Sequence, residues 1–210
     1  INRVLGTRIR FETGRWAQEV ARAERGEIDG LSASAVHPER ADRFLFTLPY
    51  VEVGKSLFVK TGNPRGLNRL EDLAGQRVAY TQGNLAEEKL LRNIAGVTPV
   101  PVASALEGTN RLLSGDVAAL LASDPYLYWA KMRDLDGVEP GLVVPDTLPL
   151  VFSIRKDRPL LVSAIDKVLT AIPQVQRLAI KQRYIAQTGR GAPTRGPDLT
   201  DAERNFLRER

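Results

Sequence analysis

The chain has 210 residues, of which 43% are hydrophobic and 26% are charged, which is ordinary for a globular protein with a buried core. It contains no cysteine, which excludes disulfides and thiolate metal sites, and it contains no apolar run long enough to cross a bilayer. The net charge of +5 comes from basic residues scattered among acidic ones, so we expect a solvated surface and no nucleic-acid partner.

The first half of the chain alternates short apolar strands with amphipathic helices, which is typical of an α/β fold. Asn84 and Glu87 form an Asn-x-x-Glu capping box, which indicates a helix start. In chain order we predict a helix at 16–25, strands at 28–34, 56–62 and 77–81, a helix from 84 to about 95, and an extended segment at 98–103.

The second half continues the alternation. We predict a helix from 104 to 114, a strand at 117–123, a helix at 125–134, extended segments at 142–146 and 148–156, and helices at 161–172 and 174–187. The stretch 188–197 is rich in Gly and Pro and indicates a linker. Thr200 and Glu203 then cap the start of another helix, so we expect the protein to continue past residue 210.

One phrase occurs twice: GEIDGLSAS at 26–34 and GDVAALLAS at 115–123, each after a helix-like stretch. Ligands of open parallel sheets bind outside the carboxyl ends of the strands, so two such units facing each other would place Ser34 and Ser123 at a shared cleft. The alternative is that Ala-Ser merely ends a buried strand. The repeat alone leaves both interpretations open.

A set of longer motifs carries a family resemblance. The motifs are IDGLSASAVHPERADRFLFTLPY, LNRLEDLAGQRVAYTQGNLAEEKLL, SGDVAALLASDP and FSIRKDRPLLVSAIDKVL, and they occur in this order over about residues 16 to 184. The chain resembles the family 3 solute-binding proteins, whose Venus-flytrap domains capture amino acids and other small polar solutes in the bacterial periplasm.

The resemblance implies an α/β, two-lobed, periplasmic-binding-protein-like (type II) fold with hinge strands. Lobe 1 would comprise residues 1–60 and 147–190 and lobe 2 residues 61–146, with 191–210 as a linker and the start of a following segment. The chain opens with INRVLGTRIRF, which matches the end of the family's first helix and its next strand. We therefore expect the family's N-terminal strand and most of that helix to be missing from this chain.

The resemblance also implies a ligand site. The family's arginine at the position of Arg40 forks onto a ligand carboxylate, whereas the alternative is a surface arginine paired with Glu39 or Asp42. Asn84 would cap its helix, reach the ligand, or do both. The full set of expected ligand-binding residues is Arg40, Ser34, Ser32, Tyr50, Gln82, Gly83, Asn84, Ser123 and Asp124.

The chain departs from the family where amino-acid binders hold the ligand's α-ammonium. Their aspartate aligns with Ser123, and the acid has moved to Asp124. A buried ammonium without a carboxylate partner is costly. We therefore expect a small carboxylate without an ammonium group, or no tight ligand. His37, the one histidine, is expected to be a loop residue, and we expect no cofactor and no metal.

Three functions follow from the resemblance. The first is a periplasmic ligand-sensing domain of a membrane-bound histidine kinase, because LTDAERNFLRER (199–210) resembles the joint between tandem flytrap domains. Its partners would be a small carboxylate or amino-acid-like ligand, adjacent flytrap or signalling domains of the same chain, and a second copy in a homodimer. It would contact the membrane only through segments outside this chain.

The second function is a free solute-binding protein of an amino-acid ABC importer, which the tail and the lost aspartate both disfavour. The third is an enzyme on the same fold, a dehydratase or a lytic-transglycosylase-associated module. That function needs a general acid/base pair, and the sequence offers only Asp124. We therefore predict no catalytic activity for this domain, although the whole protein would be a histidine kinase.

Overall fold

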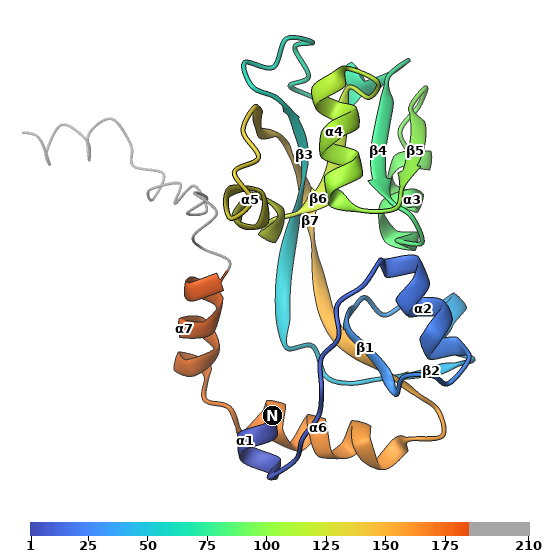
Figure 1. The fold of residues 1–210 in the computed structure, drawn as a ribbon, viewed down its shortest axis with the longest axis vertical. Coiled ribbons are helices and arrows are strands. Elements are labelled where there is room, and N and C mark those ends of the chain that lie inside the picture. The colour runs from blue at the N-terminus through green and yellow to red at the C-terminus, as the bar shows by residue number, and fades with distance from the viewer. Residues whose placement is uncertain (185–210) are drawn as a thin grey trace, which may run out of the picture.

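Two long antiparallel strands join the halves of the molecule (Figure 1). They are β3 (Val51–Lys60) and β7 (Val138–Arg155). The structure is a computed structural model that describes residues 1–184. Strand β7 is continuous where two extended segments were predicted, because β3 pairs with it from Val51↔Leu150 to Lys60↔Val138. The register between them shifts at Gly54/Lys55, midway along β3.

The lobe around the middle of the chain, lobe 2, is built on parallel strands. Strand β4 pairs in parallel with both β5 and β6, and β6 pairs antiparallel with β3. Two buried clusters cover the faces of this sheet, one around Leu73 and Leu91 and the other around Phe58 and Leu112. The elements are η2 (Leu70–Leu73), β4 (Arg77–Thr81), α3 (Leu85–Arg92), β5 (Thr98–Val102), α4 (Ala105–Ser114), β6 (Ala119–Ser123) and α5 (Pro125–Lys131).

The other lobe, lobe 1, uses the remaining halves of the same long strands. Strands β1 and β2 both pair antiparallel with β7, and two small clusters around Phe44 and Ile165 form its core. The elements are α1 (Asn2–Leu5), α2 (Trp16–Glu24), β1 (Gly30–Ser34), η1 (Pro38–Arg40), β2 (Phe44–Phe46), α6 (Pro159–Ala171) and α7 (Gln174–Tyr184). In residues 1–184, no helix combines the length and the apolar character that a membrane span requires.

The predicted α/β class and most elements are confirmed, with the sheet order β1-β7-β3-β6-β4-β5 and β2 added on β7. The short β2 and the two 3-10 turns were not predicted. The end of the last predicted helix, the linker and the segment 199–210 lie outside the described residues.

The prediction of a strand within INRVLGTRIRF (1–11) is wrong. Residues 7–15 form neither helix nor strand. The side chain of Asn2 forms hydrogen bonds with both backbone groups of Ile9. Its Nδ2 donates to the Ile9 carbonyl at 2.8 Å, and its Oδ1 accepts from the Ile9 N–H at 2.9 Å. Both hydrogen-bonding groups that Ile9 could offer to a neighbouring strand are therefore already used.

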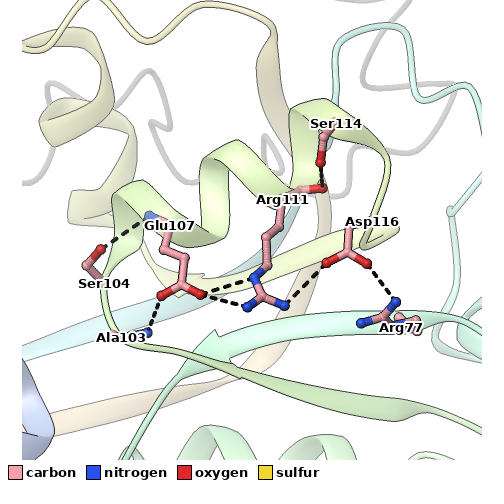
Figure 2. A network of polar contacts seen from close by, with 7 residues as sticks. All are labelled: Arg77, Ala103, Ser104, Glu107, Arg111, Ser114 and Asp116. Carbon is pink, nitrogen blue, oxygen red and sulfur yellow. Dashed lines mark hydrogen bonds and ion pairs between the residues drawn. The ribbon is translucent and has the colours of Figure 1, made fainter.

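The repeated helix–Gly–strand phrase has the same construction in both lobes. Gly26 and Gly115 have φ of +80° and +85°, so each ends its helix in the left-handed conformation that glycine adopts readily. In lobe 2 the next residue, Asp116, links α4 to β4 by accepting from Arg77 at 2.6 Å and from Arg111 at 3.3 Å (Figure 2). Figure 2 also shows Ser104 capping α4.

Candidate ligand-binding cleft

A cavity of about 380 Å³ lies between the two lobes. Three strands end there with small polar side chains: Ser34 of β1, Thr81 of β4 and Ser123 of β6. This is the place that strand geometry predicts for a ligand. The polar and aromatic residues that line the cavity are Trp16, Ser34, His37, Arg40, Lys55, Thr81, Asn84, Glu87, Ser123, Tyr126 and Trp129.

Arg40 enters the cavity from lobe 1 and is only 9% exposed. Its Nη2 donates to the Gly83 carbonyl at 3.0 Å, and its guanidinium stacks on the Trp16 ring at 5.4 Å. Burial lowers the pKa of Arg40 below its usual value, although the charges of Glu24 and Glu39 act in the opposite direction. The alternative of a surface arginine is therefore wrong, because the side chain is enclosed between the lobes.

Gly83 is the meeting point of the two lobes. Its carbonyl accepts from Trp16 Nε1 at 3.0 Å as well as from Arg40, so one oxygen of lobe 2 receives two donors from lobe 1. Gly83 has φ of +80°, and a Cβ there would lie 3.4 Å from the Cβ of Ala17 on α2. Figure 1 shows α2 directly beside the start of α3. The turn thus brings the backbones of the two lobes close together.

The first turn of α3 forms the lobe 2 wall opposite Arg40. Asn84, Leu85 and Ala86 all line the cavity, and the Asn84 side chain accepts from the Glu87 N–H at 3.3 Å. The cap is therefore confirmed, but the reciprocal half of the predicted capping box is wrong. The Glu87 carboxylate instead accepts from the Thr81 N–H at 3.1 Å, because it turns into the protein at the end of β4.

Lys55 and Glu87 are two buried charged residues in the walls of the cavity that sequence reasoning missed. Lys55 is 6% exposed and Glu87 is 3% exposed. Burial raises the pKa of Glu87 to about 7, while the Thr81 N–H and the charge of Lys55 pull it back toward its usual value. Lys55 lies directly opposite Ser123 in the β3–β6 register. A buried lysine thus lies beside Ser123 on the neighbouring strand.

Four of the nine expected ligand residues line the cavity together: Arg40, Ser34, Asn84 and Ser123. The other five do not. Tyr50 donates its hydroxyl to the Ser32 carbonyl at 2.6 Å, and its ring packs on Phe152 at 5.0 Å. Burial raises the pKa of Tyr50 to about 12. Gln82 is exposed, and its N–H donates to the Val102 carbonyl.

Asp124 is also placed differently from the expectation. Its Oδ2 accepts from the Gly54 N–H at 3.0 Å, and its own N–H donates to the Gly54 carbonyl at 3.0 Å. A carboxylate that faces the middle of β3 in this way holds the crossing strand, and it does not line the cavity. Gly83, the last of the five, contributes the carbonyl that joins the lobes.

His37 lies in the loop before η1, as expected, and it lines the cavity together with Arg40. Its Nδ1 is buried and has no hydrogen-bond partner among the described residues. Within residues 1–184, no group of three or more acidic or histidine side chains is arranged to hold a metal ion.

The missed residues had only weak signals in the sequence. Lys55 lies in the middle of β3, close to the apolar run at residues 57–59, and a lysine is rarely enclosed unless it is paired. Glu87 was assigned to the capping box, in which its carboxylate would accept from the Asn84 N–H, so no role in the cavity was expected. Trp16 lies at the first position of its helix, and nothing local indicates that its indole reaches a residue 67 positions away.

Comparisons with known proteins agree with this geometry. The model of the bacterial extracellular solute-binding proteins, family 3, matches residues 1–187. A search of curated proteins finds no match. An ancestral arginine-binding protein bound to arginine is 26% identical, with a TM-score of 0.75 over 87% of this chain and 83% of that one.

Two further solved structures share the fold at lower identity. A histidine kinase sensor domain with similarity to periplasmic binding proteins is 19% identical, with a TM-score of 0.74 over 88% of this chain and 81% of that one. The amino acid ABC transporter substrate-binding protein AbpA from Streptococcus pneumoniae, bound to L-arginine, is 19% identical, with a TM-score of 0.74 over 89% and 78%. The chain belongs to the bacterial extracellular solute-binding proteins, family 3.

Proposed function

We propose that this chain is an extracytoplasmic flytrap domain that binds a small carboxylate solute between its lobes and signals by lobe closure, as the sensor domain of a membrane-bound histidine kinase. The observation that carries the binding function is the enclosed Arg40, which faces the first turn of α3 across the cavity. A planar guanidinium and the N–H groups of a helix start both favour a carboxylate.

Closure has a mechanical basis in β3 and β7. Residues 57–59 of β3 pack in lobe 2, whereas Val151 and Ile154 of β7 are buried in lobe 1. We propose that the lobes move about the stretch of these strands near Gly54, where the β3–β7 register shifts. A ligand that binds both walls stabilises the closed arrangement by its differential affinity.

Two points support the sensor role over an importer role. Ser123 lacks the carboxylate that an amino-acid ligand's ammonium requires, and Asp124 is engaged with Gly54. The segment 199–210, outside the described residues, resembles the joint between tandem flytrap domains.

A binding assay tests the ligand function. Calorimetric titration of the chain with acetate, butyrate, succinate and the standard amino acids is expected to give saturable binding of at least one carboxylate. Arg40→Gln is expected to reduce that binding by about 10- to 100-fold, as for the loss of a charge-assisted hydrogen bond. Arg43→Gln, three residues away and exposed, is the matched control, with unchanged binding. Carboxylate affinities that Arg40→Gln leaves intact would contradict the proposal.

A separate experiment tests the sensor role. When cells are fractionated, we expect the full-length gene product in the membrane fraction. We also expect it to autophosphorylate on histidine. A gene product that is released from the periplasm as a free protein would contradict the sensor role and support the importer role.

A further inference from the structure

His37 carries a ring nitrogen that is buried and has no hydrogen-bond partner. No group among residues 1–184 donates to its Nδ1 or accepts from it, and His37 lines the cavity between the lobes. Buried polar atoms are normally hydrogen-bonded, because a buried nitrogen without a partner loses the hydrogen bond that it made to water. An unpartnered nitrogen in the wall of a cavity therefore indicates a partner that enters the cavity.

The turn that begins at His37 fixes its position relative to Arg40. His37 precedes Pro38, which disfavours helical backbone angles, and it has φ of −133° and ψ of 127°. Its carbonyl accepts from the Arg40 N–H at 2.9 Å, which closes the 3-10 turn η1. The two side chains thus enter the cavity from the two ends of one proline-containing turn.

The His37 side chain does not act as a cap for this turn. His37 occupies the N-cap position of η1, where a side chain commonly accepts a hydrogen bond from the backbone of the first turn. In the described structure its ring accepts no such bond. The local structural role that would explain a buried Nδ1 is therefore not filled.

The neighbouring polar side chains of lobe 1 differ in what they can still donate. The Ser34 hydroxyl donates to the Ala35 carbonyl at 3.1 Å, so its one hydrogen is already used. Arg40 gives one N–H to the Gly83 carbonyl and retains further donors, because a guanidinium has five. A carboxylate has two oxygens, so Arg40 and His37 can each donate to the same group.

We propose that His37 is a ligand-binding residue whose Nδ1–H donates to the solute carboxylate held by Arg40. This inference rests on the proposed function and adds a second donor from lobe 1 to the site. A neutral imidazole carries one proton, on Nδ1 or on Nε2, and a carboxylate beside Nδ1 selects the form that is protonated there. The ligand thereby supplies the partner that Nδ1 lacks.

Nuclear magnetic resonance tests the protonation of Nδ1 directly. His37 is the one histidine of the chain, so the imidazole signals of the untagged, 15N-labelled protein belong to it alone. At a fixed pH the protein is titrated with acetate, butyrate and succinate, and with acetamide and butyramide as uncharged control ligands. We expect saturation with a carboxylate to move the Nδ1 chemical shift toward that of a protonated ring nitrogen, and the amides to leave it unchanged. An Nδ1 shift that is the same in the free and saturated protein would overturn the inference.

Variants separate the hydrogen bond from the packing of the ring. His37→Phe keeps an aromatic ring without a nitrogen, and we expect it to weaken carboxylate binding about 10- to 100-fold, as for the loss of a hydrogen bond to a charged group. His37→Asn offers an amide donor close to the position of Nδ1, so we expect its affinity to stay within about threefold of the unaltered protein. His37→Ala repeats the test if phenylalanine disrupts the turn. Val36→Ala, at the exposed residue before His37, is the control with unchanged affinity.

The outcomes separate this inference from the proposed function. Carboxylate binding that depends on Arg40 but is unchanged in His37→Phe and His37→Ala would overturn the inference and leave the proposed function in place. Equal losses in His37→Asn and His37→Phe would also overturn it, because an amide donor would then not replace Nδ1. If none of the carboxylates binds, both the inference and the proposed binding function fail.

Discussion

Arg40 donates to the Gly83 carbonyl across the gap between the lobes, at 3.0 Å. The same carbonyl accepts from Trp16 Nε1 at 3.0 Å, so the residue proposed to hold the ligand also takes part in joining the lobes. A guanidinium has five N–H donors, and Gly83 uses one of them. The proposed ligand binding and the contact between the lobes therefore share a side chain.

The indole of Trp16 is expected to stabilise the closed lobes. Trp16→Phe keeps an aromatic ring beneath Arg40 but removes one donor to Gly83, at a cost of about 1 kcal/mol, or about fivefold in the closed-to-open ratio. Hydrogen exchange of residues 81–87 is expected to rise about fivefold. Trp129→Phe, which alters another aromatic ring of the cavity wall, is the control. Unchanged exchange in Trp16→Phe would show that this hydrogen bond does not hold the lobes.

Glu87 is expected to make stability fall with rising pH. Its pKa is raised from 4.5 to about 7 on folding, so below pH 4.5 both the folded and unfolded states are protonated and the full stability is present. Between pH 4.5 and 7 the unfolded state loses the proton first, and stability decreases by an amount on the order of 3 kcal/mol. Above about pH 7 the contribution stays lost.

Urea unfolding between pH 4 and 8 measures this effect. Glu87→Gln keeps an oxygen to accept from Thr81 but cannot ionise, so the difference from the unaltered protein is expected to grow in favour of the variant as pH rises. Glu88→Gln, the neighbour that pairs with Arg92 on the surface, is the control. A constant difference between the two proteins would contradict the raised pKa.

The helices and strands were predictable because their signals are local, whereas the two-lobed arrangement was implied by the family resemblance. Gly26 and Gly115 end their helices at positive φ, Asn84 and Ser104 cap theirs, and apolar runs mark the strands between them. These features depend on a few neighbouring residues, so they can be read from a short window of sequence.

The site was predictable only in part because its contacts are long-range. Arg40 was implied by the family resemblance, and Ser123 was expected from its place at the end of a predicted strand. The enclosure of Lys55 depends on how β3 packs against β6 and β7, and the Glu87 carboxylate has two backbone N–H groups within local reach. Asp124 was assigned to the ligand because nothing in the sequence places it against Gly54, 70 residues earlier.

The Ser153 hydroxyl is expected to lower the free energy of unfolding relative to an apolar side chain at the same position. It is fully buried on β7, and its hydroxyl has no hydrogen-bond partner among the described residues. Ser153→Ala removes the cost of burying that hydroxyl and is expected to raise the free energy of unfolding by about 1 kcal/mol. Ser34→Ala is the contrasting variant, because the equally buried Ser34 hydroxyl donates to the Ala35 carbonyl at 3.1 Å. Destabilisation by both variants would show that Ser153 has a partner.

Gly54 and Asp124 are expected to act as one unit at the strand crossing. A Cβ on Gly54 would lie 2.6 Å from Asp124 Oδ2, so Gly54→Ala is expected to displace the carboxylate and to lower the free energy of unfolding by about 1–3 kcal/mol. Asp124→Ala loses the hydrogen bond to the Gly54 N–H and is expected to cost a similar amount.

In the double variant the added methyl group no longer meets a carboxylate, so the combined loss is expected to be at least about 1 kcal/mol smaller than the sum of the single losses. Urea unfolding of the four proteins gives this coupling energy, and additive losses would contradict the contact. Because Asp124 holds β3 and does not line the cavity, Asp124→Ala is expected to change carboxylate affinity by less than about threefold, an energy well below that of a charge-assisted hydrogen bond. A loss of carboxylate affinity of tenfold or more would show that Asp124 contributes to ligand binding.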